Sequence, residues 1–70
     1  MKYLVIFEKT GNSHGAYVPD LPGCVAVGRS QEEVCRLIHE AIDLHLQDLR
    51  AQGLPIPLPS SAGELIDVSP

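Results

Sequence analysis

A corner with two prolines and a glycine, Pro19-Asp20-Leu21-Pro22-Gly23, constrains the fold of this chain more than any other stretch. Each proline fixes its own φ and lacks a backbone donor, so strand pairing must stop there. Asp20 can bond its own backbone two residues on, and Gly23 can take a positive φ at little cost. The apolar residues 16–18 and 24–27 on either side therefore predict two short strands joined by a stiff corner.

Residues 2–8 predict an earlier strand, because the apolar side chains from Tyr3 to Phe7 alternate between its two faces. A strand that is apolar on both faces needs cover on both. Residues 9–15, between this strand and the next, are rich in Gly, Asn and Ser. They predict a long hairpin loop.

A helix is predicted after the third strand. Ser30 is a good N-cap, and Glu33 three residues later completes a capping box. Helical spacing continues to about Gln52, and Gly53 ends it. Residues 54–59 alternate apolar residues with proline and predict an extended strap, and residues 64–68 predict a short final strand. The expected fold is one α+β domain over residues 1–70, with the order β-β-β-α-β.

The predicted elements carry more apolar surface than they can bury. On a helical wheel the apolar arc of the helix spans roughly 200°, wider than the stripe that a surface helix needs. One helix can also cover only one face of the sheet. We expect the excess to meet other copies of the chain, in a homodimer or homotetramer, unless the C-terminal tail masks it. The candidate oligomer-interface residues are Leu4, Ile6, Leu44 and Leu46.

The chain is acidic, with a formal net charge of −4 and no basic cluster. Phosphate neutralisation supplies most of the affinity of nucleic-acid binders, so we expect no direct nucleic-acid binding by the chain alone. A basic protein partner fits this charge, although ordinary solubility explains it equally well. The sequence has two cysteines, no signal segment and no apolar run long enough to span a membrane. We expect a cytoplasmic protein without membrane contact.

No arrangement of residues predicts catalysis. A two-metal nuclease needs convergent carboxylates. His45 lies on the apolar face of the predicted helix and is expected to be a hydrogen-bonded core residue. We therefore expect no catalytic residue, no metal and no cofactor. The carboxylates that a nuclease would have to use do not cluster in the predicted elements; they are Glu8, Glu40, Asp43 and Asp67.

The stretch YVPDLPGCVAVGRSQEEV, followed by a helix that contains Glu40-Ala41, resembles the N-terminal domain of the HicB family of antitoxins. The resemblance covers roughly residues 1–69, departs from the family pattern at Arg29, and implies a partial ribonuclease H-like fold. It also implies a partner, a HicA-type mRNA-cleaving toxin, which the antitoxin would silence by occluding its basic RNA-binding face. The residues expected to make this contact are Pro19, Asp20, Leu21, Pro22, Gly23, Cys24, Glu32, Glu40 and Asp43.

Many members of that family append a DNA-binding domain, and this sequence ends at Pro70 without one. We therefore expect little specific DNA binding by the chain alone. The same feature leaves a second interpretation, a stand-alone oligomeric HicB-like domain that binds another protein or a small ligand without a toxin. A short basic open reading frame beside the gene would favour the toxin.

Overall fold

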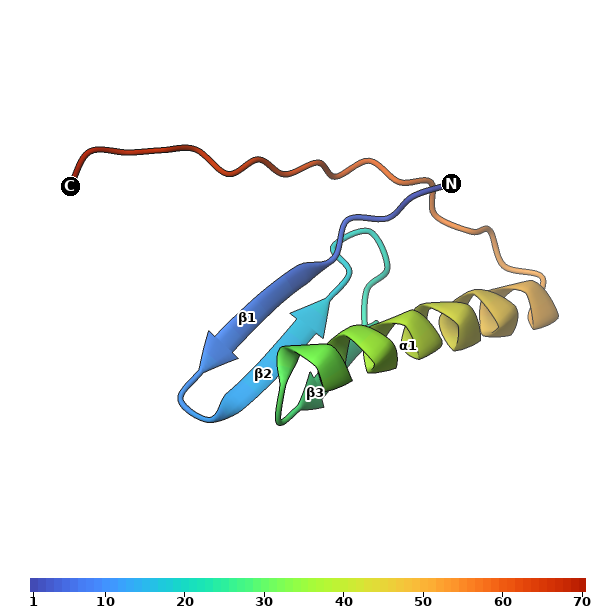
Figure 1. Ribbon diagram of the computed structural model, residues 1–70. Helices are drawn as coiled ribbons and strands as arrows, with labels where there is room; N and C mark the ends of the chain where they lie inside the picture. Colours follow the sequence, from blue (N-terminus) through green and yellow to red (C-terminus); the bar gives the residue numbers. More distant parts are fainter.

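Three strands and one helix make up the regular structure of the chain. A computed structural model describes residues 1–70. It contains β1 (Ile6–Thr10), β2 (Ser13–Tyr17), β3 (Val25–Gly28) and α1 (Gln31–Ala51). The strands form one antiparallel sheet in the order β1-β2-β3, and α1 packs across β2 and β3 on one face (Figure 1). The predicted α+β meander with a single helix is confirmed.

The connection between β1 and β2 is much tighter than the predicted loop. Thr10 pairs with Ser13 and Lys9 pairs with His14, so only two residues turn the chain. Gly11 adopts a φ of 57°, and Asn12 has no positive φ. This pattern is typical of a two-residue hairpin turn with glycine first, whose twist matches that of the strands. The predicted long loop over residues 9–15 is therefore wrong.

The first strand also begins later than its apolar sequence predicts. β2 ends at Tyr17, which pairs with Ile6, and the chain then enters the two-proline corner. Residues 2–5 therefore have no strand beside them, although Tyr3 and Val5 still pack against the core. The predicted strand over residues 2–8 becomes β1 at Ile6–Thr10 because the length of its partner limits the ladder.

The core is small and lies between the sheet, the corner and the first half of α1. Leu21, Val34 and Ile38 are the largest fully buried side chains. Leu21 comes from the corner, and the other two come from the inward side of the helix, as the helical spacing predicts. The six buried residues are Ala16, Val18, Leu21, Cys24, Val34 and Ile38.

The N-terminus of α1 is capped largely as predicted. The Ser30 hydroxyl accepts the backbone N–H of Glu33 at 3.1 Å. The return bond differs, because the Glu33 carboxylate accepts the N–H of Arg29 at 3.3 Å. Gly28 leaves room for that carboxylate, since a Cβ there would overlap Glu33 and lie 3.0 Å from Cγ2 of Val34. Local chemistry thus fixes the start of the helix at the end of β3.

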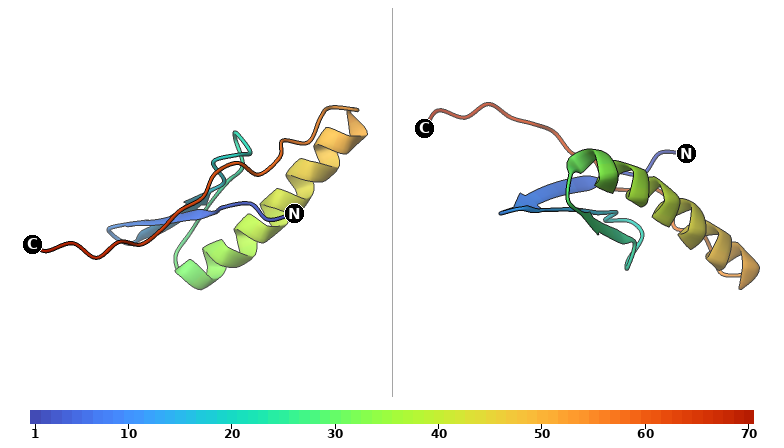
Figure 2. Two further views of the ribbon diagram at one scale, coloured as in Figure 1. Left: turned by 90° about the horizontal axis from the view of Figure 1, so that it is seen from above. Right: turned by 60° about the horizontal axis from the view of Figure 1, so that its bottom comes forward.

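The chain after α1 is extended and forms no strand. It returns past the start of β1 and then projects beyond the sheet, as the two further views in Figure 2 show. No residue after Ser61 makes a hydrogen bond to the rest of the chain. The predicted fourth strand over residues 64–68 is absent. The segment makes no backbone hydrogen bond to the outer edge of β1 or to any other strand. The long axis of the molecule reaches 48 Å as a result.

Candidate protein-binding surface

The two-proline corner is built from two consecutive turns. The carbonyl of Val18 accepts the N–H of Leu21 at 3.1 Å, and the carbonyl of Leu21 accepts the N–H of Cys24 at 3.0 Å. The N–H of Val18 donates to the carbonyl of Cys24 at 3.1 Å and closes the corner. Pro22 followed by Gly23, with a φ of 84°, is the pattern of a type II turn. The corner is therefore rigid, as its composition predicts.

Only part of the corner is available to a partner. Leu21 and Cys24 point into the core, and burial raises the pKa of the Cys24 thiol. Pro19, Pro22 and Gly23 are exposed. The corner thus offers a partner a rigid, mostly apolar outer surface, while its two inward side chains hold it to the helix.

Asp20 has a structural role that its own neighbourhood does not reveal. Its carboxylate accepts the backbone N–H groups of Ser60 and Ser61, each at 2.9 Å. It also accepts both serine hydroxyls, at 3.0 and 2.8 Å. These bonds, the backbone N–H of Ser61 first, lower the pKa of Asp20 to about 2. Asp20 thus binds Ser60 and Ser61, directly after the strap of residues 54–59, and not the local backbone that the sequence suggests.

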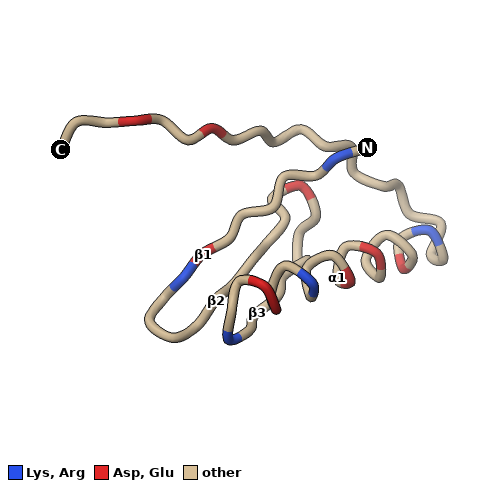
Figure 3. The backbone as a smooth tube through the Cα atoms, viewed as in Figure 1, with Lys and Arg blue, Asp and Glu red and all other residues tan.

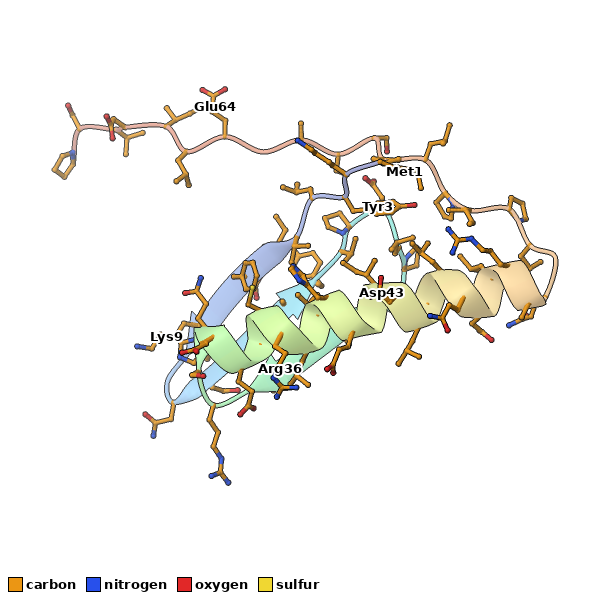
Figure 4. The ribbon with its side chains drawn as sticks, turned by 45° about the vertical axis from the view of Figure 1, so that its right-hand side comes forward. Met1, Tyr3, Lys9, Arg36, Asp43 and Glu64 are labelled. Carbon is orange, nitrogen blue, oxygen red and sulfur yellow. The ribbon has the colours of Figure 1, made fainter.

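A second contact ties the strap to the N-terminal segment. The Tyr3 hydroxyl donates a hydrogen bond to the carbonyl of Pro57. Figure 4 shows Tyr3 beneath the strap, between it and the helix, with Glu64 further along the projecting segment. Pro57 is part of the apolar and proline alternation, and it is half-buried. The strap is thus held at two places, and its predicted extended conformation is confirmed.

The outward side of α1 is acidic. Glu32, Glu40 and Asp43 are all exposed, and at 100° per residue they lie within an arc of about 80°. Acidic segments recur along the helix in Figure 3, and Figure 4 labels Asp43 on it. Arg36 lies in the same arc and pairs with Glu40 at 3.5 Å. Exposed pairs of this kind are weak, so a partner can displace this one at little cost.

The structure brings the acidic residues together, but it does not join them to the corner. Val34 and Ile38 face the core cluster that contains Leu21 and Cys24. The acidic residues stand on the opposite side of the same helix, so they point away from the corner. The site residues expected from the sequence therefore form two separate surfaces.

A third surface, which residue-by-residue reading missed, is the sheet face that α1 does not cover. Ile6 pairs with Tyr17, and Tyr17 pairs with Val25, so these side chains share one face. On this face Tyr17, Val25 and Val27 are 40, 60 and 68 % exposed. The sequence indicates an uncovered apolar sheet face, because the first predicted strand is apolar on both faces. The pairing register of the three strands was needed to identify the residues on it.

The expected interface residues differ in how much surface they offer. Leu44 is 65 % exposed on α1, whereas Leu46 packs against the core. Leu4 and Ile6 are half-buried, and both line a hollow between the first strand and the tail. Of the four, Leu44 offers the most free surface.

The candidate carboxylates for a nuclease are dispersed. Glu8 lies on β1, Asp67 lies on the projecting tail, and all four are exposed. No group of three or more His, Cys, Asp and Glu side chains is placed to hold a metal ion. No helix combines the length and apolar character that crossing a membrane requires.

Comparison with known proteins gives a family for the chain. A protein of the UPF0150 group from Helicobacter pylori J99 is 51% identical over 49 residues, which cover 70% of this chain and 68% of the relative. UPF0150 proteins from a Synechocystis strain and from Thermoplasma acidophilum are 40% and 38% identical, over 79% and 81% of this chain and 71% and 84% of the relatives. No solved structure matches the chain significantly.

The family match covers the whole described fold. A model of the HicB-like antitoxins of bacterial toxin–antitoxin systems matches residues 3–69. The matched range contains the corner, the sheet, α1 and the strap that Asp20 holds. The chain therefore belongs to the HicB-like antitoxin family.

Proposed function

We propose that this chain binds a HicA-type mRNA-cleaving toxin in the cytoplasm and silences it by covering its RNA-binding face. The observation that carries the proposal is the family match over residues 3–69. The function is binding, and no step of it requires catalysis by this chain. The name of the family supports a toxin as partner, and the kind of toxin and the mode of occlusion are our proposal.

The acidic side of α1 is the surface we propose for the toxin. A protein that binds RNA needs a basic face, because phosphate neutralisation supplies much of its affinity. Glu32, Glu40 and Asp43 present carboxylates along about 16 Å of helix, at 1.5 Å per residue. Opposite charge accelerates the encounter and selects this surface over the apolar ones. The exposed residues of the corner, Pro19, Pro22 and Gly23, face away from this acidic side and remain a separate candidate surface for a partner.

We also propose that the protein works as an oligomer of two or four copies. The uncovered sheet face carries Tyr17, Val25 and Val27, and Leu44 lies exposed on the helix. Apolar patches of this kind mark interaction surfaces in small domains. A domain of this length commonly completes its stability by association.

Binding to a toxin encoded beside this gene tests the proposal. The purified chain and that protein should form a complex with a dissociation constant below micromolar, measured by titration calorimetry. The affinity should fall as salt is raised, because exposed charges are screened. The absence of a complex at micromolar concentrations would defeat the proposal and favour a stand-alone domain with another partner.

A pair of charge reversals locates the surface. Glu40→Lys with Asp43→Lys should weaken the complex on the order of tenfold or more, mainly by slowing association. Asp48→Lys is the matched control, since Asp48 lies on the same helix but about 120° away from Arg36, outside the acidic arc. Equal weakening by the control and the double variant would place the toxin elsewhere.

A further inference from the structure

The outer edge of β1 is an unpaired sheet edge. In the order β1-β2-β3, β1 pairs only with β2, so its other side has no partner strand. No bulge or proline interrupts it, and its partner ladder runs over all five residues from Ile6 to Thr10. An uninterrupted edge of this kind is a template for another strand.

The C-terminal segment 64–68 is a strand sequence without a sheet. Leu65 is fully exposed, and Ile66 and Val68 are 72 and 81 % exposed. The segment has no backbone hydrogen bond to the rest of the chain. Burying three apolar side chains would release their surface from water, and the backbone of the segment is free to pair, so this segment favours a partner.

The tail leaves its own β1 in a fixed direction. Asp20 binds Ser60 and Ser61, and Tyr3 binds Pro57, so the strap is held just before the free segment. Gly63 lies against Leu4, where a Cβ would sit 3.6 Å from the leucine methyl groups. Beyond that point the chain diverges from β1, as Figure 1 and the right-hand view of Figure 2 show. A hollow separates Gly63–Leu65 from Leu4–Phe7.

We propose that segment 64–68 of one copy pairs with the outer edge of β1 of a second copy, and that the second copy returns the same contact. Such an exchange satisfies the free edge and the free strand at once, and it closes with two-fold symmetry. The second copy is the occupant because this chain carries both halves of the contact, while its own tail is directed past its own edge. The hydrogen bonds from Ser60 and Ser61 to Asp20 then set the direction in which the tail leaves the domain.

This inference gives a structural basis to the self-association in the proposed function, and it does not involve the toxin. A failure here would leave toxin binding standing, because the test uses this chain alone. A failure of toxin binding would likewise leave the exchange untouched.

The first test compares the mass of two full-length double variants. Light scattering at micromolar concentration should give two or four times 7.6 kDa for the unaltered chain. Leu65→Asp with Ile66→Asp should halve that mass with the same helix content, because charged side chains cannot pack against the edge. Leu54→Asp with Leu58→Asp is the matched control, exposed but outside the segment, and should keep the mass of the unaltered oligomer.

Two results would overturn the proposal. One is an unaltered chain that is monomeric, and the other is an oligomer whose mass is unchanged by the substitutions at Leu65 and Ile66. Amide hydrogen exchange then distinguishes a tail that pairs with a second copy from a tail that folds onto its own sheet. Protection of the amides of residues 64–68 should rise with protein concentration, whereas protection that is independent of concentration would contradict the proposal.

Discussion

Asp20 links two parts of the chain that are 40 residues apart. Its carboxylate receives four hydrogen bonds from Ser60 and Ser61, so the two-proline corner acts as the anchor of the C-terminal strap. The rigidity of the corner makes this anchor effective, because turns at Pro19 and Pro22 fix the position of the carboxylate. A residue expected to touch a partner thus also sets where the tail begins.

The titration of Asp20 tests this anchor. Its pKa of about 2 in the folded chain lies below the ordinary value of 3.8, because the serine groups bond the ionised form. The bonds therefore stabilise the fold fully above about pH 4, and their contribution is lost as the pH falls toward 2. Carboxyl NMR should find the low pKa, and Ser60→Ala with Ser61→Ala should raise it only part of the way, because the two backbone N–H donors remain. A normal pKa in the unaltered chain would refute the anchor.

Gly23 gives a second prediction for a single residue. Its φ of 84° lies in the left-handed region, and a Cβ would meet nothing within 4 Å. The cost of Gly23→Ala is therefore conformational, about 1 kcal/mol in the free energy of unfolding, measured with urea. Gly63→Ala is the control, because its φ is not positive and its Cβ would make an ordinary contact. Equal losses in the free energy of unfolding for the two substitutions would contradict a conformational cost specific to Gly23.

At the scale of elements, sequence and structure agree wherever the signal is local. Ser30 and Gly53 bracket α1 closely, because capping chemistry depends only on neighbouring residues. The predicted hairpin loop is wrong because the polar stretch of residues 9–15 hides a two-residue Gly-Asn turn, whose flanking residues pair as strands. The fourth strand failed because pairing depends on a distant edge, and the partners of Asp20 could not be found for the same reason.

The cap of α1 should contribute measurably to stability. Ser30→Ala removes the acceptor for the N–H of Glu33 and should lower the free energy of unfolding by about 1 kcal/mol. Ser13→Ala, at an exposed strand position, is the comparison and should have a much smaller effect. Urea denaturation followed by circular dichroism measures both, and indistinguishable midpoints would argue against the cap.

The two sides of α1 should respond differently to truncation. Ile38 is fully buried, so Ile38→Ala should cost about 2–5 kcal/mol and unfold much of so small a domain. Leu44→Ala removes a mostly exposed side chain and should leave the helix content unchanged. Thermal melts compare the two at a concentration low enough to dissociate oligomers, and similar losses there would contradict the difference between the two sides of the helix.

At the scale of the whole molecule, one small core supports three surfaces. Six buried residues hold the sheet to α1, while the outer sheet face, the acidic helix side and the projecting tail stay free. We propose the tail and the free edge of β1 as the contact with a second copy, and the acidic side as the contact with a toxin. The chain presents these surfaces on one small fold, in keeping with its membership of an antitoxin family.

The most direct test takes the product of the gene beside this one, the proposed RNA-cleaving toxin, and measures its rate of RNA cleavage as this chain is added. We predict that cleavage stops when the chain equals the toxin in amount. With Glu40→Lys and Asp43→Lys, a large excess of the chain over the toxin should be needed to stop it. Cleavage that continues unchanged in the presence of excess folded chain would contradict the account.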